Sequence, residues 1–265
     1  MQRIGLSTLY LQFYGRPFDQ IPADLRMDRE EAERPEVWEI IDSSPHTLDR
    51  DRLKILGQFV KQGYRFTIHC PFEEGLNIAD LDVGRRRMSL DRMIRSIDAA
   101  AELEAGLWVL HPGGWRGESV ARAEELNNDA IASLHDYAGE RGVRVAVENM
   151  NPTLPLFLRR PTDFSRFRER TGLDLKIVFD VGHAHIGGLI DEFIDRLGNH
   201  FTSIHCHDNG GRLDDHLGIG DGGIDWERVA KRLGSLGYLE YYVVEALSKP
   251  FESVAKLKRL IRGFG

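Results

Sequence analysis

The segment Leu175-Lys176-Ile177-Val178-Phe179-Asp180-Val181-Gly182-His183 contains the pattern on which the fold prediction depends. Its first half is a short, mainly apolar run, which is typical of a strand buried on both faces of a parallel sheet. An aspartate ends the run, and a glycine and a histidine follow soon after it. The same order, an apolar run followed by a carboxylate or an imidazole, returns at other points of the chain.

Eight runs rich in β-branched or aromatic residues occur along the chain, and each interval between them contains a stretch with the apolar spacing of a helix. Eight strand and helix units in 265 residues predict an α/β fold, a (β/α)8 TIM barrel in which residues 1–265 form one domain. A doubly wound open sheet is less favoured, because no Gly-x-Gly-x-x-Gly turn follows the first run. The predicted strands are Arg3 to Thr8, Val37 to Ile41, Arg65 to Cys70, Leu107 to His111, Val143 to Glu148, Leu175 to Asp180, Thr202 to His207 and Tyr241 to Glu245.

The composition argues against several classes of protein. A net charge of -7, from 35 Lys and Arg against 42 Asp and Glu, is unfavourable for a general polyanion binder. No stretch approaches the roughly 18 apolar residues that a membrane span needs, and the first residues start a strand pattern instead of an apolar signal core. We therefore expect a cytoplasmic protein without a membrane partner. Cys70 and Cys206 are too few for a disulfide framework or a thiolate zinc site, and we expect both to be small buried residues.

Potential metal ligands end six consecutive predicted strands, from the third to the eighth. In a barrel, the carboxyl ends of all strands meet at one mouth, and random placement would bring only about 1.5 of the histidines to these ends. Five of the ten histidines lie there. A single strand-end histidine can be structural, but a converging set of buried ionisable groups requires a compensating cation. Without cysteine, the set suits zinc, manganese, iron or cobalt; its members are His69, His111, Glu148, Asp180, His183, His205, His207 and Glu245.

A glycine-rich loop follows the seventh predicted strand over residues 209–226, and its six glycines allow the backbone to fold over a ligand. Asp214 and His216 are two residues apart, so an extended backbone would direct both side chains into the mouth.

We expect Asp225 to be the N-cap of the next helix, and Arg16 to Arg34 to form the first helix after an elaborated loop. We expect His185 either to orient a ligand or to lie at the rim, and the other histidines near helices to be at the surface, namely His46, His135 and His200.

These motifs resemble the xylose-isomerase-like barrel superfamily, which contains sugar (phosphate) isomerases and epimerases and the endonuclease IV type of abasic-site nuclease. The resemblance covers nearly the whole chain. Its specific part consists of Glu148, Asp180-Val-Gly-His183, His205-x-x-Asp208, Gly220-Asp-Gly-Gly223 and Glu245.

The two branches of this superfamily imply different metal centres. The epimerase branch implies one divalent ion, held by Glu148, Asp180, His205 and Glu245. The nuclease branch implies a three-zinc cluster with further ligands at His69, His111, His183, Asp214 and His216. The sequence His205-Cys-His-Asp208 differs from His-Leu-Asn-Asp, which is usual in the nuclease branch.

On the first hypothesis, the protein is a divalent-metal-dependent isomerase or epimerase that acts on a sugar or sugar phosphate through an enediolate, with a zinc or manganese ion. Glu148 and Glu245 would exchange a proton with the substrate carbon, and His183 would hold a substrate oxygen. The candidate substrate-binding residues are Arg212, which could pair with a phosphate or carboxylate, and the side chains of His207 and Trp115. The expected partner is a small carbohydrate.

The alternative is an endonuclease IV-like zinc-dependent phosphodiester hydrolase, in which two or three ions share Glu148 and the partner is nucleic acid. A third possibility is a noncatalytic sugar-binding barrel with a structural ion. It is the least favoured, because mouths lined by several ionisable groups more often perform chemistry. Loops with exposed aromatic residues near the mouth are compatible with a homodimer.

Overall fold

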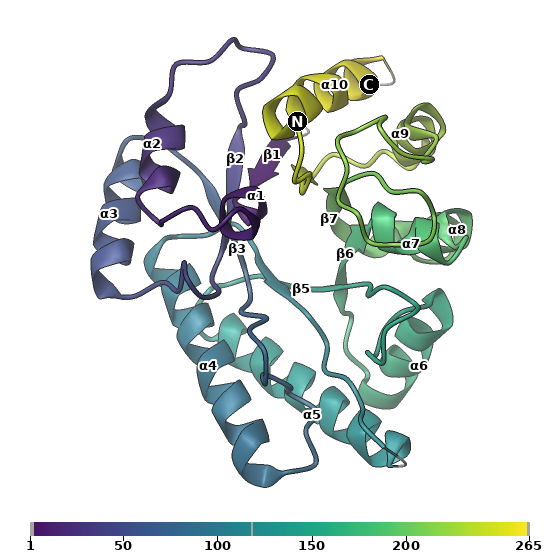
Figure 1. Cartoon of the computed structure of the whole chain (residues 1–265). Coiled ribbons are helices and arrows are strands. Elements are labelled where there is room, and N and C mark those ends of the chain that lie inside the picture. Colours follow the sequence, from purple (N-terminus) through teal and green to yellow (C-terminus); the bar gives the residue numbers. More distant parts are fainter. Residues whose placement is uncertain (1–2, 118, 264–265) are drawn as a thin grey trace.

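Eight parallel strands form a closed barrel in the computed structural model, which describes residues 3–117 and 119–263 (Figure 1). Each strand pairs with the next along the sequence, and the last pairs with the first. The predicted (β/α)8 fold is therefore confirmed, and the open-sheet alternative is wrong. Each strand overlaps its predicted run: β1 (Arg3–Ser7), β2 (Val37–Ile41), β3 (Phe66–His69), β4 (Trp108–Leu110), β5 (Val145–Glu148), β6 (Lys176–Asp180), β7 (Phe201–Cys206) and β8 (Tyr241–Val244).

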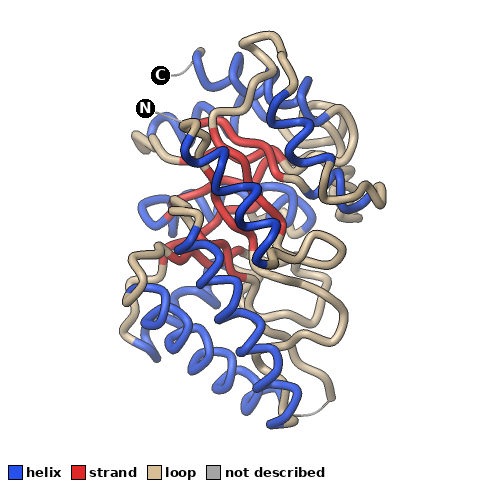
Figure 2. The backbone as a smooth tube through the Cα atoms, turned by 90° about the vertical axis from the view of Figure 1, so that its left-hand side faces the viewer, coloured by secondary structure: helices blue, strands red, loops and turns tan. Residues whose placement is uncertain are grey.

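Helices surround the barrel and cover the outer face of its strands (Figure 2). The first helix begins earlier than predicted, because a short helix follows β1 directly; the segment from Arg16 to Arg34 contains the second helix. The helices are α1 (Leu9–Phe13), α2 (Gln20–Arg26), α3 (Arg50–Lys61), α4 (Val83–Glu102), α5 (Val120–Gly139), α6 (Pro161–Thr171), α7 (Val181–Ile186), α8 (Ile190–Leu197), α9 (Trp226–Ser235) and α10 (Pro250–Arg262), with a 3-10 turn, η1 (Gly198–His200). The prediction for Asp225 is confirmed, since its side chain accepts a hydrogen bond from the amide of Arg228 at the start of α9.

An apolar layer fills the barrel below its mouth. Its members form one buried cluster of Val37, Leu107, Val109, Ala146, Val178, Tyr241 and Val243. Because side chains alternate along a strand, the residue two positions further on faces the same side. The next residue on the inward face after Ala146 is therefore Glu148; after Val178 it is Asp180, and after Val243 it is Glu245. Polar and ionisable groups therefore lie directly above the apolar layer, at the carboxyl ends of the strands.

The layer between strands and helices contains Cys70 and Cys206, which are buried as predicted. The prediction that His46 lies at the surface is wrong, because this residue is fully buried. Nε2 of His46 lies 2.7 Å from the backbone oxygen of Arg16, and its ring packs edge-on against Phe18, so the segment between α1 and α2 covers it.

Among the described residues, no helix combines the length and the apolar character that a membrane crossing requires.

Candidate metal centre

Glu148, Asp180, His205 and Glu245 form a buried group at the mouth of the barrel, and their ligand atoms lie within 4.8 Å of one another. Nδ1 of His205 lies 3.4 Å from Oε2 of Glu148 and 3.3 Å from Oε2 of Glu245. Within the described part of the chain, neither ring nitrogen of His205 has a partner in hydrogen-bond geometry. The structure therefore places His205, and not His207, between these two carboxylates.

A second group consists of His69, His111 and Glu148, whose ligand atoms also lie within 4.8 Å of one another. Nε2 of His111 lies 3.1 Å from Nε2 of His69 and 3.1 Å from Oε2 of Glu148. The ring of Phe72 stacks on that of His111 with a centroid distance of 5.9 Å. Glu148 belongs to both groups and is the residue through which the two groups are connected.

A third set of side chains lies on the side of the mouth covered by the loop between β7 and α9. Nε2 of His183 lies 2.9 Å from Oδ2 of Asp214, and Nε2 of His207 lies 3.2 Å from Oδ2 of Asp180. The ligand atoms here form two overlapping groups, one of Asp180, His183 and His207 and one of His207, Asp214 and His216. The structure thus brings all nine predicted metal ligands to one mouth.

Asp208 organises the loop between β7 and α9. Its fully buried carboxylate accepts hydrogen bonds from the backbone amides of Gly220 and Ile224 and from the indole nitrogen of Trp226. These bonds satisfy a buried carboxylate without a cation and fix the loop that carries two of the predicted ligands.

Backbone carbonyl oxygens orient three of the histidine rings. The Nδ1 atoms of His69, His183 and His216 donate to such oxygens over 2.8, 2.9 and 2.8 Å. The opposite ring nitrogen, Nε2, lies 3.1 Å from Nε2 of His111 in His69, 2.9 Å from Oδ2 of Asp214 in His183 and 3.6 Å from Oδ1 of Asp214 in His216. In His183, Nδ1 also lies 3.4 Å from Oε1 of Glu148. Histidines that bind metals are commonly held by a hydrogen bond from the ring nitrogen that does not bind the ion.

The donor set fits a divalent cation. Burial alone would raise the pKa of Glu148, but the neighbouring His205 and His111 hold it well below its ordinary value. Burial likewise opposes ionisation of Glu245, and His205 lowers the pKa of that carboxyl. Both carboxylates are therefore ionised at neutral pH, and the unpaired nitrogens of His205 lie among them. Mixed nitrogen and oxygen donors of this kind suit zinc or manganese.

Zinc binding is expected to release protons at pH 7. Burial opposes the charged rings, but Asp180 and Asp214 outweigh it and raise the pKa of His183 to about 10, while Asp214 and Glu245 raise the pKa of His216 to about 9. Both rings are thus protonated in the metal-free protein at pH 7 and would have to lose a proton to bind an ion, so affinity is expected to rise between pH 7 and about 10. Calorimetric titration in two buffers of different ionisation enthalpy measures the protons released. A value of zero would contradict this prediction.

Glu39 is a candidate functional residue that the sequence reasoning missed. It lies within β2 and is fully buried, with Oε1 at 3.3 Å from Nε2 of His205. The hydroxyl of Thr67 donates to its other oxygen over 3.1 Å. A glutamate inside a buried apolar run was an available signal, because an unpaired charge is rarely buried. A carboxylate behind a ligand histidine sets the orientation of the ring and the position of its proton.

Replacing Glu39 by leucine is expected to weaken metal binding by about 10- to 100-fold, the usual effect of losing such a carboxylate. Glutamine keeps an oxygen acceptor for the ring of His205, so Glu39→Gln should cause a smaller loss. Competition with a chromophoric chelator measures the affinity, and Glu36→Gln, at an exposed residue before the same strand, is the matched control. Equal affinities of Glu39→Leu and the wild-type protein would show that Glu39 does not support the ligand.

The predicted substrate-binding residues lie in different surroundings. Arg212 is exposed on the loop between β7 and α9, and Trp115 is partly buried after β4. His207 is fully buried among the candidate ligands. His185 packs under the loop, since a Cβ on Gly223 would lie 3.3 Å from its Nε2.

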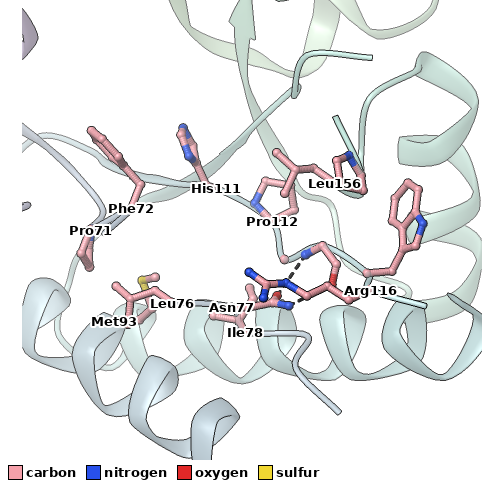
Figure 3. A pocket seen from close by; sticks show the side chains of 14 residues that line it. Pro71, Phe72, Leu76, Asn77, Ile78, Met93, His111, Pro112, Arg116 and Leu156 are labelled. Atoms are coloured by element: carbon pink, nitrogen blue, oxygen red, sulfur yellow. Dashed lines mark hydrogen bonds between the residues drawn. The ribbon is translucent and has the colours of Figure 1, made fainter. Parts of the chain in front are cut away.

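A pocket of about 280 Å³ adjoins the candidate metal ligands at His111 (Figure 3). It lies between the loops that follow β3, β4 and β5, and its walls include Met93 and Leu156. Figure 3 shows the Arg116 side chain extending toward Asn77, whose amide is already hydrogen-bonded to the backbone of Gly114. The pocket therefore presents mainly apolar walls beside the polar mouth.

Comparison with known proteins identifies relatives across most of the chain. An uncharacterized protein of Methanocaldococcus jannaschii, MJ1311, is 27% identical over 239 residues, which are 86% of this chain and 80% of the relative. A probable endonuclease 4 of Mycoplasmoides gallisepticum is 26% identical over 192 residues, which are 63% of this chain and 59% of the relative.

The solved structures that resemble this one include a D-tagatose 3-epimerase-like protein. Its TM-score is 0.87 at 24% sequence identity, over 99% of this chain and 96% of that chain, and at this identity the likeness shows the fold. Residues 35–262 match the family described as xylose isomerase-like TIM barrel. The resemblance found in the sequence is thus confirmed, and the chain belongs to the xylose isomerase-like TIM barrel family.

Proposed function

We propose that this protein is a divalent-metal-dependent isomerase or epimerase that acts on a sugar or sugar phosphate. The observation that carries the proposal is the position of Glu148 and Glu245, whose carboxylates lie 3.4 and 3.3 Å from the same ring nitrogen of His205. Moving a hydrogen on a sugar through an enediolate requires a base for the proton of a C–H bond and a group that returns a proton. The likeness to a D-tagatose 3-epimerase-like structure supports a carbohydrate substrate.

Glu148, Asp180, His205 and Glu245 would hold the ion, which would stabilise the negative charge that develops on the substrate oxygens. Because Glu148 and Glu245 are ionised, either can accept the proton of the reacting carbon, which leaves an enediolate. The two carboxylates come from β5 and from the residue after β8, and their ligand atoms lie within 4.8 Å of each other. A carboxylate that has taken up a proton from solvent then returns it to the substrate carbon. His183 would donate to a substrate oxygen.

Deuterium incorporation tests this proposal. The zinc- or manganese-loaded protein is incubated in D2O with a panel of ketoses and ketose phosphates, and the products are followed by proton NMR. We expect deuterium at the reacting carbon, and we expect Glu245→Gln to abolish both turnover and exchange. Glu240→Gln is the matched control, because Glu240 lies at the opposite end of the same strand. Turnover without deuterium uptake under any condition would refute the proposed chemistry.

A second candidate function is zinc-dependent phosphodiester hydrolysis. It is favoured by one observation: the ligand groups extend beyond the four residues that a single ion requires, to His69 and His111 on one side and to Asp214 and His216 on the other. Ions bound there would activate a water molecule and stabilise the leaving oxygen. The net charge of -7 opposes binding of duplex DNA.

Elemental analysis and a nicking assay separate the two functions. A content near three zinc ions per chain, with cleavage of a duplex that contains an abasic site, would support the hydrolase. One tightly bound ion without cleavage would support the isomerase. The protein is purified without a metal-binding affinity tag, so that the ion content reflects the chain itself.

A further inference from the structure

The pocket beside His111 has no role in the reaction proposed above. It has a volume of about 280 Å³ and adjoins the mouth of the barrel, because His111 belongs both to its wall and to the ligand group that contains Glu148. Nε2 of His111 lies 3.1 Å from Oε2 of Glu148, which is proposed above as a base. A substrate that reaches Glu148 therefore has this pocket within reach of its remaining atoms.

The side chains that line the pocket are mainly apolar. Its polar side chains are those of Asn77, His111 and Arg116. Apolar surface that a ligand removes from water stabilises binding, so walls of this kind favour a ligand group without polar atoms. The larger apolar residues of the wall are Phe72, Leu76, Ile78, Met93, Trp115 and Leu156 (Figure 3).

The polar groups of the wall already have partners within the protein. The amide oxygen of Asn77 accepts a hydrogen bond from the backbone amide of Gly114, and its nitrogen donates to the backbone oxygen of the same residue, both over 3.0 Å. The backbone amide of Gly113 donates to Oδ1 of Asn127 over 2.8 Å, and its oxygen accepts from the amide of Phe157 over 2.9 Å. A sugar hydroxyl placed here would lose its hydrogen bonds to water without gaining equivalent ones.

The loops that form the pocket are packed closely against one another. A Cβ on Gly113 would lie 2.6 Å from the Cβ of Ala79, and a Cβ on Gly114 would lie 2.4 Å from the backbone oxygen of Pro155. The backbone amide of Trp115 donates to this same oxygen over 3.0 Å. These contacts join the loops after β3, β4 and β5. A pocket with fixed walls requires little ordering when a ligand group enters it, which favours affinity.

We propose that this pocket is a specificity subsite for an apolar substituent, and that the substrate is a sugar derivative that carries a hydrocarbon or aromatic group. The inference rests on the proposed function and adds the class of substrate to it. Apolar cavities of about 150 Å³ are large enough to bind benzene. The pocket, at about 280 Å³, therefore has room for a benzyl or short alkyl group.

A first experiment is independent of any turnover. The full-length, metal-loaded protein is titrated with 4-fluorobenzyl alcohol and followed by fluorine NMR. We expect a bound signal that is lost in Leu156→Trp, because this partly buried side chain lines the pocket and a larger ring there would fill it. Leu76→Trp, at another partly buried residue of the wall, is the second variant. Leu154→Trp, at an exposed residue of the same loop as Leu156, is the matched control and should keep the signal.

A second experiment connects the pocket to the reaction. The zinc- or manganese-loaded protein is given D-fructose and D-tagatose, together with their methyl and benzyl ethers at either terminal hydroxyl. We expect a benzyl ether to have a kcat/KM about 10-fold or more above that of the corresponding methyl ether, because its ring is buried in the pocket. Leu156→Trp and Leu76→Trp should remove this preference, whereas Leu154→Trp should retain it.

Three results would overturn the inference. The fluorine signal is absent from the wild-type protein or persists in both pocket variants; the benzyl ethers react no better than the methyl ethers; or D-fructose 6-phosphate is preferred to all of them and Arg116→Gln removes that preference. The last result would mean that the pocket recognises an anion through Arg116.

Failure of the proposed function would look different. Neither the free ketoses nor their ethers would then be turned over or exchange deuterium. The fluorine signal would still decide whether the pocket binds an apolar group: its loss in the two pocket variants would support the inference, and its persistence would refute it.

Discussion

Replacing Glu148 by glutamine is expected to lower turnover by about 10³-fold, within the range of 10²–10⁴ that a general acid or base contributes. Glu148 contacts His111 at 3.1 Å and His205 at 3.4 Å, and it belongs to two of the ligand groups. Glutamine has nearly the same shape, but it can neither accept a proton nor supply a negative charge to a cation. The variant should therefore lose the base and part of the metal affinity together.

Turnover of the metal-loaded variant and its metal content after desalting check this prediction, and the metal content does not depend on knowing the substrate. Glu169→Gln, at an exposed residue of α6, is the matched control. Circular dichroism shows whether the barrel is still folded. A Glu148→Gln variant with wild-type turnover would exclude Glu148 from the reaction.

Addition of zinc or manganese to the metal-free protein is expected to raise Tm by about 10 °C. An ion at 1,000 times its Kd stabilises the folded chain by about 4 kcal/mol, and a protein of this size gains roughly 2–4 °C per kcal/mol. The physical reason is the concentration of buried carboxylates at the mouth, where Glu148, Asp180 and Glu245 lie in one group. An ion lowers their mutual repulsion, and the unfolded chain lacks this arrangement.

Differential scanning calorimetry with a chelator and with saturating metal measures the shift. His205→Asn, which removes the candidate nitrogen ligand of this group, should reduce the shift by at least half. His135→Asn, at a partly exposed residue of α5, should leave the shift unchanged. Equal Tm values with chelator and with metal would mean that the mouth does not bind an ion in the folded protein.

The architecture and the location of the site could be predicted because their signals are local. A strand buried on both faces is recognisable as an apolar run, as in the residues before Asp180, and alternation then places a polar strand-end residue over the apolar layer. The capping aspartate of α9, Asp225, is recognisable from its neighbours for the same reason. His46 could not be placed, because its burial depends on a segment that folds over it from another part of the chain.

The partners of each ligand had to come from the structure. Glu39 is distant from His205 in the sequence and meets it only across the interior of the closed barrel. The sequence predicts that His207 binds substrate; the structure adds that its Nε2 lies beside Asp180 and Asp214. Those contacts depend on the loop that Asp208 holds, and no pattern in the sequence specifies the shape of that loop.

Residue order alone specifies that this chain is an eight-stranded barrel and that its ionisable groups gather at one end. The barrel follows from apolar strand runs that alternate with stretches of helical spacing, and the common end follows from the direction of parallel strands; these signals act over short distances along the chain. Only the folded molecule decides which candidate ligands lie together, because Glu148 and Glu245, or His207 and Asp214, approach one another through barrel closure and loop packing. Those are contacts between distant segments, and their distances follow from the packing of the whole chain.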